Sequence, residues 1–354
     1  MVKIKCVIGG QYGSEGKGKV ARQLCKDKLT DMAVRCGGPN SGHTVTLWND
    51  EEISLQQLPT GVVEDVNAVG LSAGCLIDKE RLFEEISMFD IGTIEDRGSK
   101  ALVIDKNAVV IKDDYVEEEK KRKLGERVAS TCTGTGEAVA KRAIRDPSVT
   151  LAGDDPELEK YTVDSVGNYV RSNRTVSSTT VIEGTQGFGL SVYHSPFYPK
   201  ATSRDTTVSG FLSEVGISPF DLDECIMVMR TFPIRVGGNS GPMENEIDWE
   251  TIRKESGAPH KISERTSVTD KKRRVGRFEW EMARKAFNYN KPTQLAIMGL
   301  DYLNYDDREA EKYNELSEES IEFLEKINRI VGNVPINFLG TGPANDELID
   351  RRKD

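Results

Sequence analysis

The strongest constraint on the fold is a glycine-rich stretch near the start of the chain. Residues 9–19 read Gly-Gly-Gln-Tyr-Gly-Ser-Glu-Gly-Lys-Gly-Lys, between an apolar run at 4–8 and a helix-like run at 20–26. In a strand–loop–helix unit, glycines let backbone amides converge on an anion, and the helix start adds a partial positive charge. Lys17 adds a full positive charge. The pattern therefore predicts a phosphate-binding loop inside an α/β fold.

The loop departs from the common P-loop pattern at two positions. Gln11 stands where that pattern has its first glycine. Gly18 stands where a serine or threonine hydroxyl would hold magnesium. The stretch is therefore a phosphate loop of a different kind.

Composition limits the classes of partner. The 354 residues are 37% hydrophobic, which allows a substantial core, and their formal net charge is −10 without a basic block. This charge argues against binding along a nucleic-acid backbone. No apolar run has the length of a membrane span and no signal peptide is recognisable, so we expect a cytoplasmic protein. The six cysteines form no Cys-x-x-Cys pair and are interpreted as reduced core thiols.

Strand-like and helix-like runs alternate along the chain. This order predicts an α/β fold with a large, mostly parallel central sheet flanked by helices, in a single catalytic domain over residues 1–354. Ligands of such folds bind at the carboxyl ends of the strands. The expected strands are 3–9, 32–36, 101–104, 108–111, 179–183, 225–230, 293–299 and 334–338. The expected helices are 17–28, 78–89, 113–124, 137–145, 155–172, 204–215, 278–289 and 315–330.

The glycine-rich loop resembles the signature of adenylosuccinate synthetases, Gly-Gln-Trp-Gly-Asp-Glu-Gly-Lys-Gly-Lys, with two changes. Tyr12 replaces the tryptophan and Ser14 replaces the aspartate. In the family that aspartate is the catalytic base and helps to hold magnesium. A serine at this position resembles the phage branch of the family, the 2-aminoadenylosuccinate synthetases, which supply a precursor of 2-aminoadenine for viral DNA.

A second glycine-rich stretch contains one of three histidines. Residues 35–44 read Arg-Cys-Gly-Gly-Pro-Asn-Ser-Gly-His-Thr and are similar to the family's Gly-Gly-x-Asn-Ala-Gly-His-Thr loop. A lone histidine in a surface loop would carry no function, but a neutral imidazole beside a phosphoryl-transfer site can donate a proton to a developing oxyanion. The resemblance implies that role for His43. It also implies a nucleotide-phosphate contact for Asn40 and a magnesium contact for the backbone carbonyl of Gly42.

A third stretch, residues 130–145, combines hydroxyl groups and glycines ahead of a helix. By itself such a stretch is either a linker or another anion cradle. It resembles the family's Thr-Thr-Gly-x-Gly-x-Gly-Pro-Ala loop, which implies that Thr131 binds the substrate monophosphate. The resemblance also implies that Arg145 reaches the phosphate in the neighbouring subunit of a homodimer. Arg142 is the alternative for that arginine.

Three further matches follow in the family's order. Residues 182–187 read Ile-Glu-Gly-Thr-Gln-Gly, similar to the family's Glu-Gly-Ala-Gln-Gly, and imply that the Gln186 amide bonds O6 of a 6-oxopurine. Residues 198–203 resemble Tyr-Pro-x-Val-Thr-Ser and imply that Thr202 binds phosphate. Residues 235–242 resemble Arg-Val-Gly-x-Gly-Pro and imply a backbone contact from Val236 to the ribose.

Residues 266–276 read Thr-Ser-Val-Thr-Asp-Lys-Lys-Arg-Arg-Val-Gly. Without a relative, such a basic run is either a solvated patch or a nuclear localisation signal. It resembles the family's Thr-Thr-Gly-Arg-x-Arg-Arg-x-Gly loop, which grips the carboxylates of aspartate. The resemblance assigns aspartate binding to Thr269, Lys271 and Arg273. Lys271 replaces an arginine, so a point charge stands where the family has a bidentate fork.

The resemblance also places the phosphoryl donor. Residues 298–301 read Met-Gly-Leu-Asp, where the family's GTP-binding form has Thr-Lys-Leu-Asp. Asp301 is retained, but Gly299 removes the lysine that covers the guanine, so ATP, dATP and GTP all remain open as donors. The residues implied for the donor are Gly13, Glu15, Gly16, Lys17, Gly18, Gly42, His43, Thr44, Asp301, Gly340, Gly342 and Pro343. Those implied for Mg²⁺ are Ser14 and Gly42.

The reaction implied by the resemblance has two steps at one site. N1 of a 6-oxopurine loses its proton while O6 attacks the γ-phosphate of the donor, and the amine of L-aspartate then displaces the 6-phosphate. We predict dGMP as the purine, with ATP or dATP as donor, because Ser14 in place of a carboxylate leaves room for the 2-amino group. Ser14, Lys17, His43 and Gln186 are the predicted catalytic residues.

Two alternatives remain open at this point. The chain is then either an ordinary adenylosuccinate synthetase, acting on IMP, L-aspartate and GTP, or a catalytically inactive nucleotide-binding regulator. The second alternative arises because an unassisted serine hydroxyl is too weakly basic to take the N1 proton at neutral pH.

Overall fold

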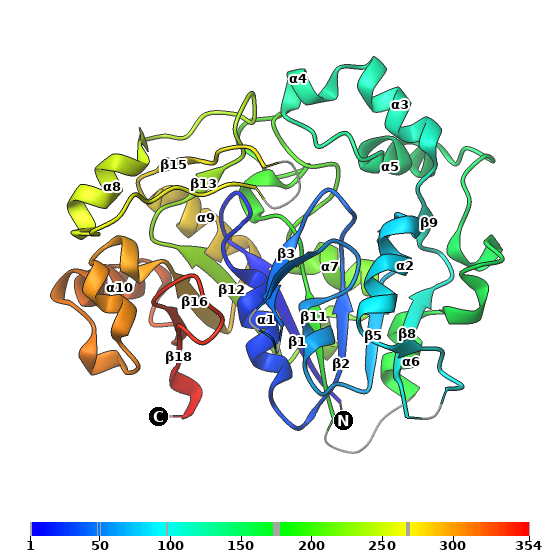
Figure 1. Cartoon of the computed structure of the whole chain (residues 1–354), viewed down its shortest axis with the longest axis horizontal. Helices are drawn as coiled ribbons and strands as arrows, with labels where there is room; N and C mark the ends of the chain where they lie inside the picture. The colour runs from blue at the N-terminus through cyan, green and yellow to red at the C-terminus, as the bar shows by residue number, and fades with distance from the viewer. Residues whose placement is uncertain are drawn as a thin grey trace.

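A large sheet forms the centre of the molecule. The structure is a computed structural model (Figure 1) that describes residues 2–47, 49, 51–96, 98–172, 178–266 and 270–353. Within these residues the sheet has 11 strands. They are β1 (Lys3–Gly9), β2 (Thr30–Arg35), β5 (Ala68–Leu71), β7 (Ile91–Gly92), β8 (Lys100–Asp105), β10 (Thr162–Val163), β11 (Thr179–Glu183), β12 (Glu224–Arg230), β16 (Gln294–Met298), β17 (Ile336–Gly340) and β18 (Leu348–Asp350).

The sheet is parallel almost throughout. Its strand order is β10-β8-β5-β2-β11-β1-β12-β16-β17-β18, and β7 pairs with β8 outside this path. Each of these neighbouring pairs is parallel except β17 with β18. The prediction of a large, mostly parallel sheet is therefore confirmed.

Helices cover both faces of the sheet, because successive side chains of a strand point to opposite sides. On β1, Ile4, Cys6 and Ile8 enter one hydrophobic core, whereas Val7 enters the other. The first core is completed by α6 (Val166–Ser172), α7 (Val208–Val215), α9 (Trp280–Asn290) and α10 (Glu318–Val331). The second core is completed by α1 (Lys17–Cys25) and α2 (Lys79–Met88).

Smaller units surround this sandwich and appear on the upper side of Figure 1. One is a three-stranded antiparallel sheet near α8 (Trp249–Ser256), and another is a helical group, with short two-stranded pairs beside them. The antiparallel strands are β13 (Ile234–Arg235), β14 (Glu246–Ile247) and β15 (Arg274–Gly276). The helical group is α3 (Asp113–Lys121), α4 (Leu124–Val128) and α5 (Thr135–Ile144). The pairs are β3 (His43–Thr46) with β4 (Glu52–Leu55) and β6 (Leu76–Ile77) with β9 (Val109–Val110).

One expected helix is wrong. Residues 155–172 do not form a single helix, because Thr162 and Val163 join the edge of the sheet as β10 beside β8. The backbone amide of Val166 then donates to the Asp105 carboxylate at 3.0 Å, and only Val166–Ser172 is helical. Strand pairing at residues 162–163 therefore interrupts a stretch that the local sequence pattern predicted to be one helix.

Two simpler expectations concern the cysteines and membranes. Cys132 is half-buried, the other five cysteines are buried, and all six are free thiols. Among the helices of the described residues, none combines the length and the apolar character that crossing a membrane requires.

The topology brings the predicted motifs together. Strands β2, β11, β1, β12, β16 and β17 are consecutive neighbours in the sheet and run parallel. Their carboxyl ends therefore lie along one edge, and the loop that follows each strand begins there. Residues that are hundreds of positions apart in the sequence meet at this edge.

Candidate active site

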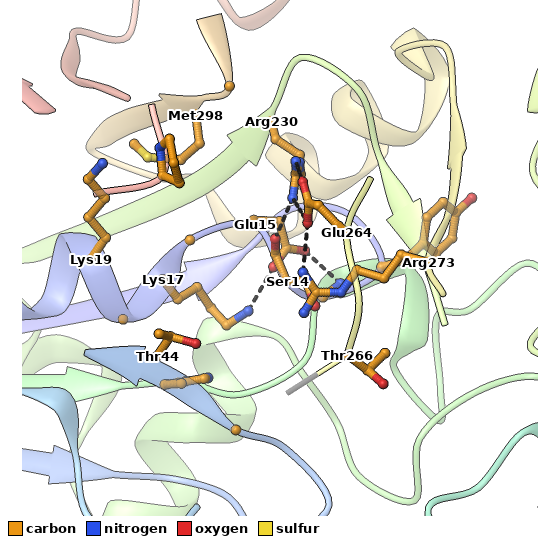
Figure 2. Close-up of a pocket in the computed structure, with 18 of the residues that line it drawn as sticks. Ser14, Glu15, Lys17, Lys19, Thr44, Arg230, Glu264, Thr266, Arg273 and Met298 are labelled. Carbon is orange, nitrogen blue, oxygen red and sulfur yellow. Dashed lines mark hydrogen bonds and ion pairs between the residues drawn. The ribbon is translucent and has the colours of Figure 1, made fainter. Parts of the chain in front are cut away.

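A cavity of about 610 Å³ opens over this edge of the sheet. Figure 2 shows its interior, with Met298 and Lys19 at one end, Arg273 at the other, and Ser14, Glu15 and Lys17 between them. Most of the residues predicted from the sequence line it. They are Gly13, Ser14, Glu15, Gly16, Lys17, Gly18, Asn40, Gly42, His43, Thr44, Thr131, Gln186, Val236, Arg273, Asp301, Gly342 and Pro343.

Five predicted residues are not among the described lining residues. Thr269 lies outside the described residues. Two others have backbone contacts instead: the Thr202 amide donates to the Leu190 carbonyl at 2.7 Å, and Gly340 ends β17. The other two, Lys271 and Arg145, are exposed.

The two alternative arginines of the third stretch differ in their contacts. The guanidinium of Arg142 donates to the Ala73 carbonyl of its own chain at 2.6 Å. Arg145, at the C-terminal end of α5, is exposed beside Ile144, whose exposed fraction is 71%. Both arginine side chains are exposed, and the two differ in that Arg142 is bonded to its own chain.

The loop of residues 9–18, hereafter the phosphate loop, holds an anion of its own. The carboxylate of Glu15 accepts the backbone amides of Gln11 at 3.1 Å and Gly13 at 2.8 Å, and the Lys17 ammonium at 2.7 Å. Lys17 also donates to the Gln186 carbonyl. Glu15 and Lys17 are only 1% and 3% exposed. The loop amides thus converge on the protein's own Glu15 carboxylate, which Lys17 neutralises, and phosphate binding by this loop stays a prediction.

Glycines near this carboxylate provide space for it. A Cβ atom on Gly187 would lie 2.2 Å from the Glu15 carboxylate, and one on Gly9 would lie 2.6 Å from it. Gly187 has an extended backbone that any residue adopts, so its requirement is for space and not for conformation. Glycine at these two positions is therefore explained by how closely Glu15 packs against the loops.

Ser14 is exposed at the turn of the phosphate loop. Its φ of 56° is in the left-handed region, and its carbonyl accepts from Arg230 at 3.2 Å. Aspartate adopts this conformation more readily than most residues do. The backbone would therefore accept the family's aspartate, and the presence of serine is a difference in side-chain chemistry alone.

His43 is held by a buried ion pair. Arg35 ends β2 and Glu183 ends β11, and their side chains are 3.3 Å apart. The Nδ1 atom of His43 contacts the Glu183 carboxylate and lies 2.9 Å from Nη1 of Arg35. A ring that accepts from Arg35 carries its proton on Nε2, whereas a ring that donates to Glu183 leaves Nε2 as an acceptor.

The charges around His43 keep it neutral at physiological pH. Burial, together with Arg35 and Lys17, lowers the pKa of His43 to about 4, although Glu183 acts in the opposite sense. Burial alone would raise the pKa of Glu183, but His43 and Arg35 outweigh it and lower that pKa. A neutral imidazole next to a carboxylate is therefore the resting state of this part of the cavity.

A second buried ion-pair network lies on the other side of Ser14. Glu264 accepts from Nη1 and Nη2 of Arg230, from Nη1 of Arg273 at 2.7 Å and from the Tyr302 hydroxyl at 2.8 Å. Burial would raise the pKa of Glu264, but Arg230 and Arg273 hold it at about 2. Glu264 is therefore a permanent carboxylate in the wall of the cavity.

The far end of the cavity surrounds Asp301. Burial raises the pKa of Asp301 to about 7, despite Arg230 and Arg308 nearby. Lys19 donates to the carbonyls of Gly342 at 3.0 Å and Glu347 at 2.7 Å, and burial lowers its pKa to about 8. This end therefore offers a cation and a carboxyl that changes charge near neutral pH.

The stretch of residues 130–137, hereafter the threonine loop, binds a side chain of the protein where the sequence pattern predicts a ligand anion. The carboxylate of Glu119, a fully buried residue of α3, accepts the amides of Gly134 at 2.9 Å, Gly136 at 2.6 Å and Glu137 at 3.3 Å. The start of α5 is therefore occupied by the protein's own carboxylate. Thr131, at the other end of this loop, lines the cavity and bonds Thr133 at 3.2 Å.

Sequence reasoning missed several residues of the site. Arg35 and Glu183 stand inside quoted motifs but received no role, and Arg230, Glu264 and Tyr302 belong to none. A signal was available for three of them: Arg35, Glu183 and Arg230 are each the last residue of a buried parallel strand. Charged residues are rarely buried without a partner. A charge that ends such a strand is therefore a sequence indication of a site.

The fold and the cavity define the class of protein. A parallel sheet whose carboxyl edge carries a lysine-bearing phosphate loop, a histidine-bearing loop and a basic loop is typical of enzymes that bind nucleotides and transfer phosphoryl groups. Comparison with known proteins narrows this class. The profile of the adenylosuccinate synthetase family matches residues 6–151 and 150–308. The chain therefore belongs to the adenylosuccinate synthetase family.

Individual relatives agree over nearly the whole chain. The adenylosuccinate synthetase of Methanocaldococcus jannaschii is 36% identical over 350 residues, covering 98% of this chain and 96% of the relative. That of Pyrococcus horikoshii is 34% identical over 348 residues, covering 98% of each. The chain is thus an adenylosuccinate-synthetase-type carbon–nitrogen ligase of purine biosynthesis, a family that uses nucleotides, aspartate and Mg²⁺.

Two solved structures share the fold. The cyanophage S-2L succinoaminodeoxyadenylate synthetase (PurZ), bound to dGMP and to dATP as an energy donor, superposes with a TM-score of 0.80 at 25% identity, covering 99% of this chain and 96% of that one. The fully ligated adenylosuccinate synthetase of Plasmodium falciparum superposes with a TM-score of 0.82 at 22% identity, covering 98% and 99%. The second likeness concerns the fold alone.

Proposed function

We propose that this enzyme joins dGMP to L-aspartate, with hydrolysis of ATP or dATP, to give N6-succinyl-2-amino-2′-deoxyadenylate, a nucleoside diphosphate and phosphate. The observation that carries the proposal is Ser14, a short neutral side chain exposed at the turn of the phosphate loop and lining the cavity beside Lys17. The likeness to a phage synthetase bound to dGMP and dATP supports it.

The proposed catalytic roles follow from charge and reach. Lys17 neutralises charge on the migrating phosphoryl group, and the Gln186 amide bonds O6 of the purine. Ser14 either accepts from the 2-amino group of guanine or relays the N1 proton through water. His43 donates through Nε2 in the tautomer that accepts from Arg35, because that tautomer gives a neutral ring a proton to offer.

The remaining substrate contacts are proposed along the same cavity. The monophosphate and ribose of dGMP are assigned to Asn40, Thr131, Thr202 and Val236, with Arg145 contributed by the second subunit of a homodimer. L-aspartate is assigned to Thr269, Lys271 and Arg273. In this proposal the whole chain acts as one catalytic domain.

The donor and its metal complete the assignment. The donor phosphates lie against the phosphate loop and Thr44, and its base lies towards Asp301, Gly340, Gly342 and Pro343. Mg²⁺ prefers oxygen ligands and usually keeps only one or two from the protein, with phosphates and water completing the shell. The Ser14 hydroxyl and the Gly42 carbonyl line one cavity and fit that preference. A bound Mg²⁺ would neutralise phosphate charge.

An ordinary adenylosuccinate synthetase, acting on IMP with GTP, is the second candidate. The observation that favours it is the 34–37% identity to archaeal adenylosuccinate synthetases over almost the full chain. An inactive nucleotide-binding regulator is the third, and the presence of Lys17, His43 and Gln186 in one cavity opposes it.

The test compares dGMP with IMP. The purified protein is given L-aspartate, Mg²⁺ and ATP, dATP or GTP, and the succinylated nucleotide is measured for each purine. We expect product from dGMP and little from IMP. Product from IMP alone would replace the proposal by the second candidate, and no product from either purine, with nucleotide still bound, would support the third.

A variant of Ser14 tests the reason for the preference. Ser14→Asp places a carboxylate where the 2-amino group is proposed to lie, and should shift the ratio of kcat/KM from dGMP towards IMP by about tenfold to a hundredfold. Ser263→Asp is the matched control, because it adds the same charge to the cavity wall at a residue that does not belong to the phosphate loop. Faster turnover of dGMP by Ser14→Asp would contradict the steric argument.

A further inference from the structure

Two arginines of the cavity share one carboxylate. Arg230 ends β12, Arg273 directly precedes β15, and both pair with Glu264. Replacing Glu264 by a neutral side chain would leave two guanidinium groups next to each other. Burying two guanidinium groups beside one carboxylate carries a large desolvation cost. We therefore expect this cluster to have a role other than attaching the loop.

The orientation of Arg273 is the first indication of that role. Glu264 holds this guanidinium through Nη1 alone. Its Nε is buried and has no hydrogen-bond partner among the described residues. Arg273 lines the cavity, and Figure 2 shows it extending alongside Ser14 towards Glu264. One side of the fork is therefore fixed by the protein, and the other side remains for a carboxylate ligand.

The backbone repeats the same pairing. The amide of Arg273 donates to the Glu264 carbonyl at 2.9 Å, so these two residues close the base of the segment between them through both main chain and side chain. Arg230 then links this base to the phosphate loop, since it also donates to the Ser14 carbonyl at 3.2 Å. The Tyr302 hydroxyl fixes Glu264 from a third direction.

We propose that Glu264 is a positioning residue for L-aspartate: it orients the Arg273 guanidinium for a substrate carboxylate and ties that arginine, through Arg230, to the phosphate loop at Ser14. This inference rests on the proposed ligation of L-aspartate. A guanidinium that is already held at one nitrogen loses less side-chain entropy when it binds a carboxylate. Its planar group is also oriented in advance for bidentate binding. The link to Ser14 fixes the position of the aspartate site relative to Ser14, the residue proposed to accept from the 2-amino group of guanine.

The test separates aspartate binding from the rest of the reaction. Glu264→Gln keeps the shape of the side chain but removes its charge. We expect its KM for L-aspartate to rise about tenfold or more, while the KM for the purine monophosphate changes less than about threefold. Glu246→Gln is the matched control: Glu246 pairs with Arg274, next to Arg273 in sequence, but does not line the cavity.

A double-mutant comparison shows whether Glu264 acts through Arg273. In the Arg273→Lys background, Glu264→Gln should raise the KM for L-aspartate by less than about threefold, because the group that it orients is already gone. Equal effects of Glu264→Gln in both backgrounds would overturn the proposal. A structural role alone would lower the temperature of unfolding equally in both without this dependence.

Milder variants keep the proposal falsifiable if Glu264→Gln does not fold. Tyr302→Phe removes one hydrogen bond to the Glu264 carboxylate and should raise the KM for L-aspartate about twofold to threefold. An unchanged aspartate KM in Tyr302→Phe, together with a lowered unfolding temperature, would overturn the proposal. If the wild-type protein makes no aspartate-dependent product from dGMP, the proposed function fails. If it makes product and Glu264→Gln leaves the aspartate KM unchanged, only the present inference fails.

Discussion

The phosphate loop and the threonine loop have the same design and different uses. Both are glycine-rich, both precede a helix, and in both the backbone amides converge on a glutamate carboxylate. In the phosphate loop the carboxylate is Glu15, which belongs to the loop, is neutralised by Lys17 and lines the cavity. In the threonine loop it is Glu119, which reaches in from another helix and is fully buried.

This difference shows what such a pattern predicts. Glycines ahead of a helix predict an anion at the helix start, but the anion is either a ligand or a side chain of the protein. The start of α5 is filled by Glu119, so a monophosphate would meet only the Thr131 end of the threonine loop. The phosphate loop differs in that its carboxylate is paired with a lysine, Lys17, that lines the cavity.

The largest effect is expected at Lys17. Lys17→Met should lower kcat by about a hundredfold to a thousandfold, because it removes the positive charge nearest to the proposed phosphoryl transfer. Lys26→Met is the control, since Lys26 is exposed just beyond α1. Steady-state turnover gives the answer, and a loss of less than threefold with the fold intact would mean that the phosphate loop is no more catalytic than the threonine loop.

The two glutamates provide the direct comparison. Glu119→Gln should lower the free energy of unfolding by about 2–3 kcal/mol, because its amide nitrogen faces backbone amides that need an acceptor. Its KM for purine monophosphate should change less than threefold. Glu15→Gln should lower kcat at least about tenfold, because the partner of Lys17 loses its charge. Denaturant unfolding and steady-state kinetics are measured on both variants. A loss of kcat in Glu119→Gln, together with a loss of stability alone in Glu15→Gln, would contradict the comparison.

The phosphate-loop side of the comparison also responds to acid. The pKa of folded His43 is about 4, whereas an unfolded histidine has a pKa of about 6.5. Between these values the unfolded chain binds a proton that the folded chain does not, so stability falls as the pH is lowered through this window. From pH 7 to pH 5 the loss from this group should be about 1–2 kcal/mol.

His43→Asn should remove that part of the loss. Urea unfolding at pH 7 and at pH 5 measures it in both proteins. The same difference between the two pH values in the variant and in the wild type would show that His43 is not held neutral by its surroundings. In the wild-type protein the lowered pKa of Glu183 concerns more acidic conditions than this window.

The smallest effect is expected at the threonine loop. Thr131→Val should raise the KM for the purine monophosphate by about fivefold to tenfold, because it removes one hydrogen bond. Thr133→Val is matched to it, because Thr133 loses the same mutual hydrogen bond but does not line the cavity. Equal KM values for the two variants would show that the threonine loop supports the site only as a scaffold.

Much of the fold was predictable because its signals are local. Alternating apolar strands and amphipathic helices predicted the parallel sheet, and seven of the eight expected helices have a counterpart within a few residues of their expected ends. β5 was missed because it is a run of four residues containing Gly70. A Cβ at that glycine would lie 2.6 Å from the terminal methyl group of Met32, so glycine lets this side chain pack against the strand. The expected helix at 155–172 failed because sheet pairing depends on a strand more than fifty residues away.

The site divides in the same way. Residues in glycine-rich motifs, such as Lys17, His43 and Gln186, were found from the sequence and line one cavity. Glu264 was not found, because its importance lies in partners that are distant in the sequence, such as Arg230 at 34 positions and Tyr302 at 38. No motif records such a pairing.

The sequence by itself determined the α/β class, the phosphate loop and the family, because strand periodicity, glycine conformational freedom and motif order are properties of neighbouring residues. The tertiary structure alone decided which loops share the cavity, which helix start is closed by Glu119, and which charges surround His43 and Arg273. These outcomes depend on strand order in the sheet, which brings distant carboxyl ends together, and on burial, which fixes the charge state of each group once its neighbours are in place.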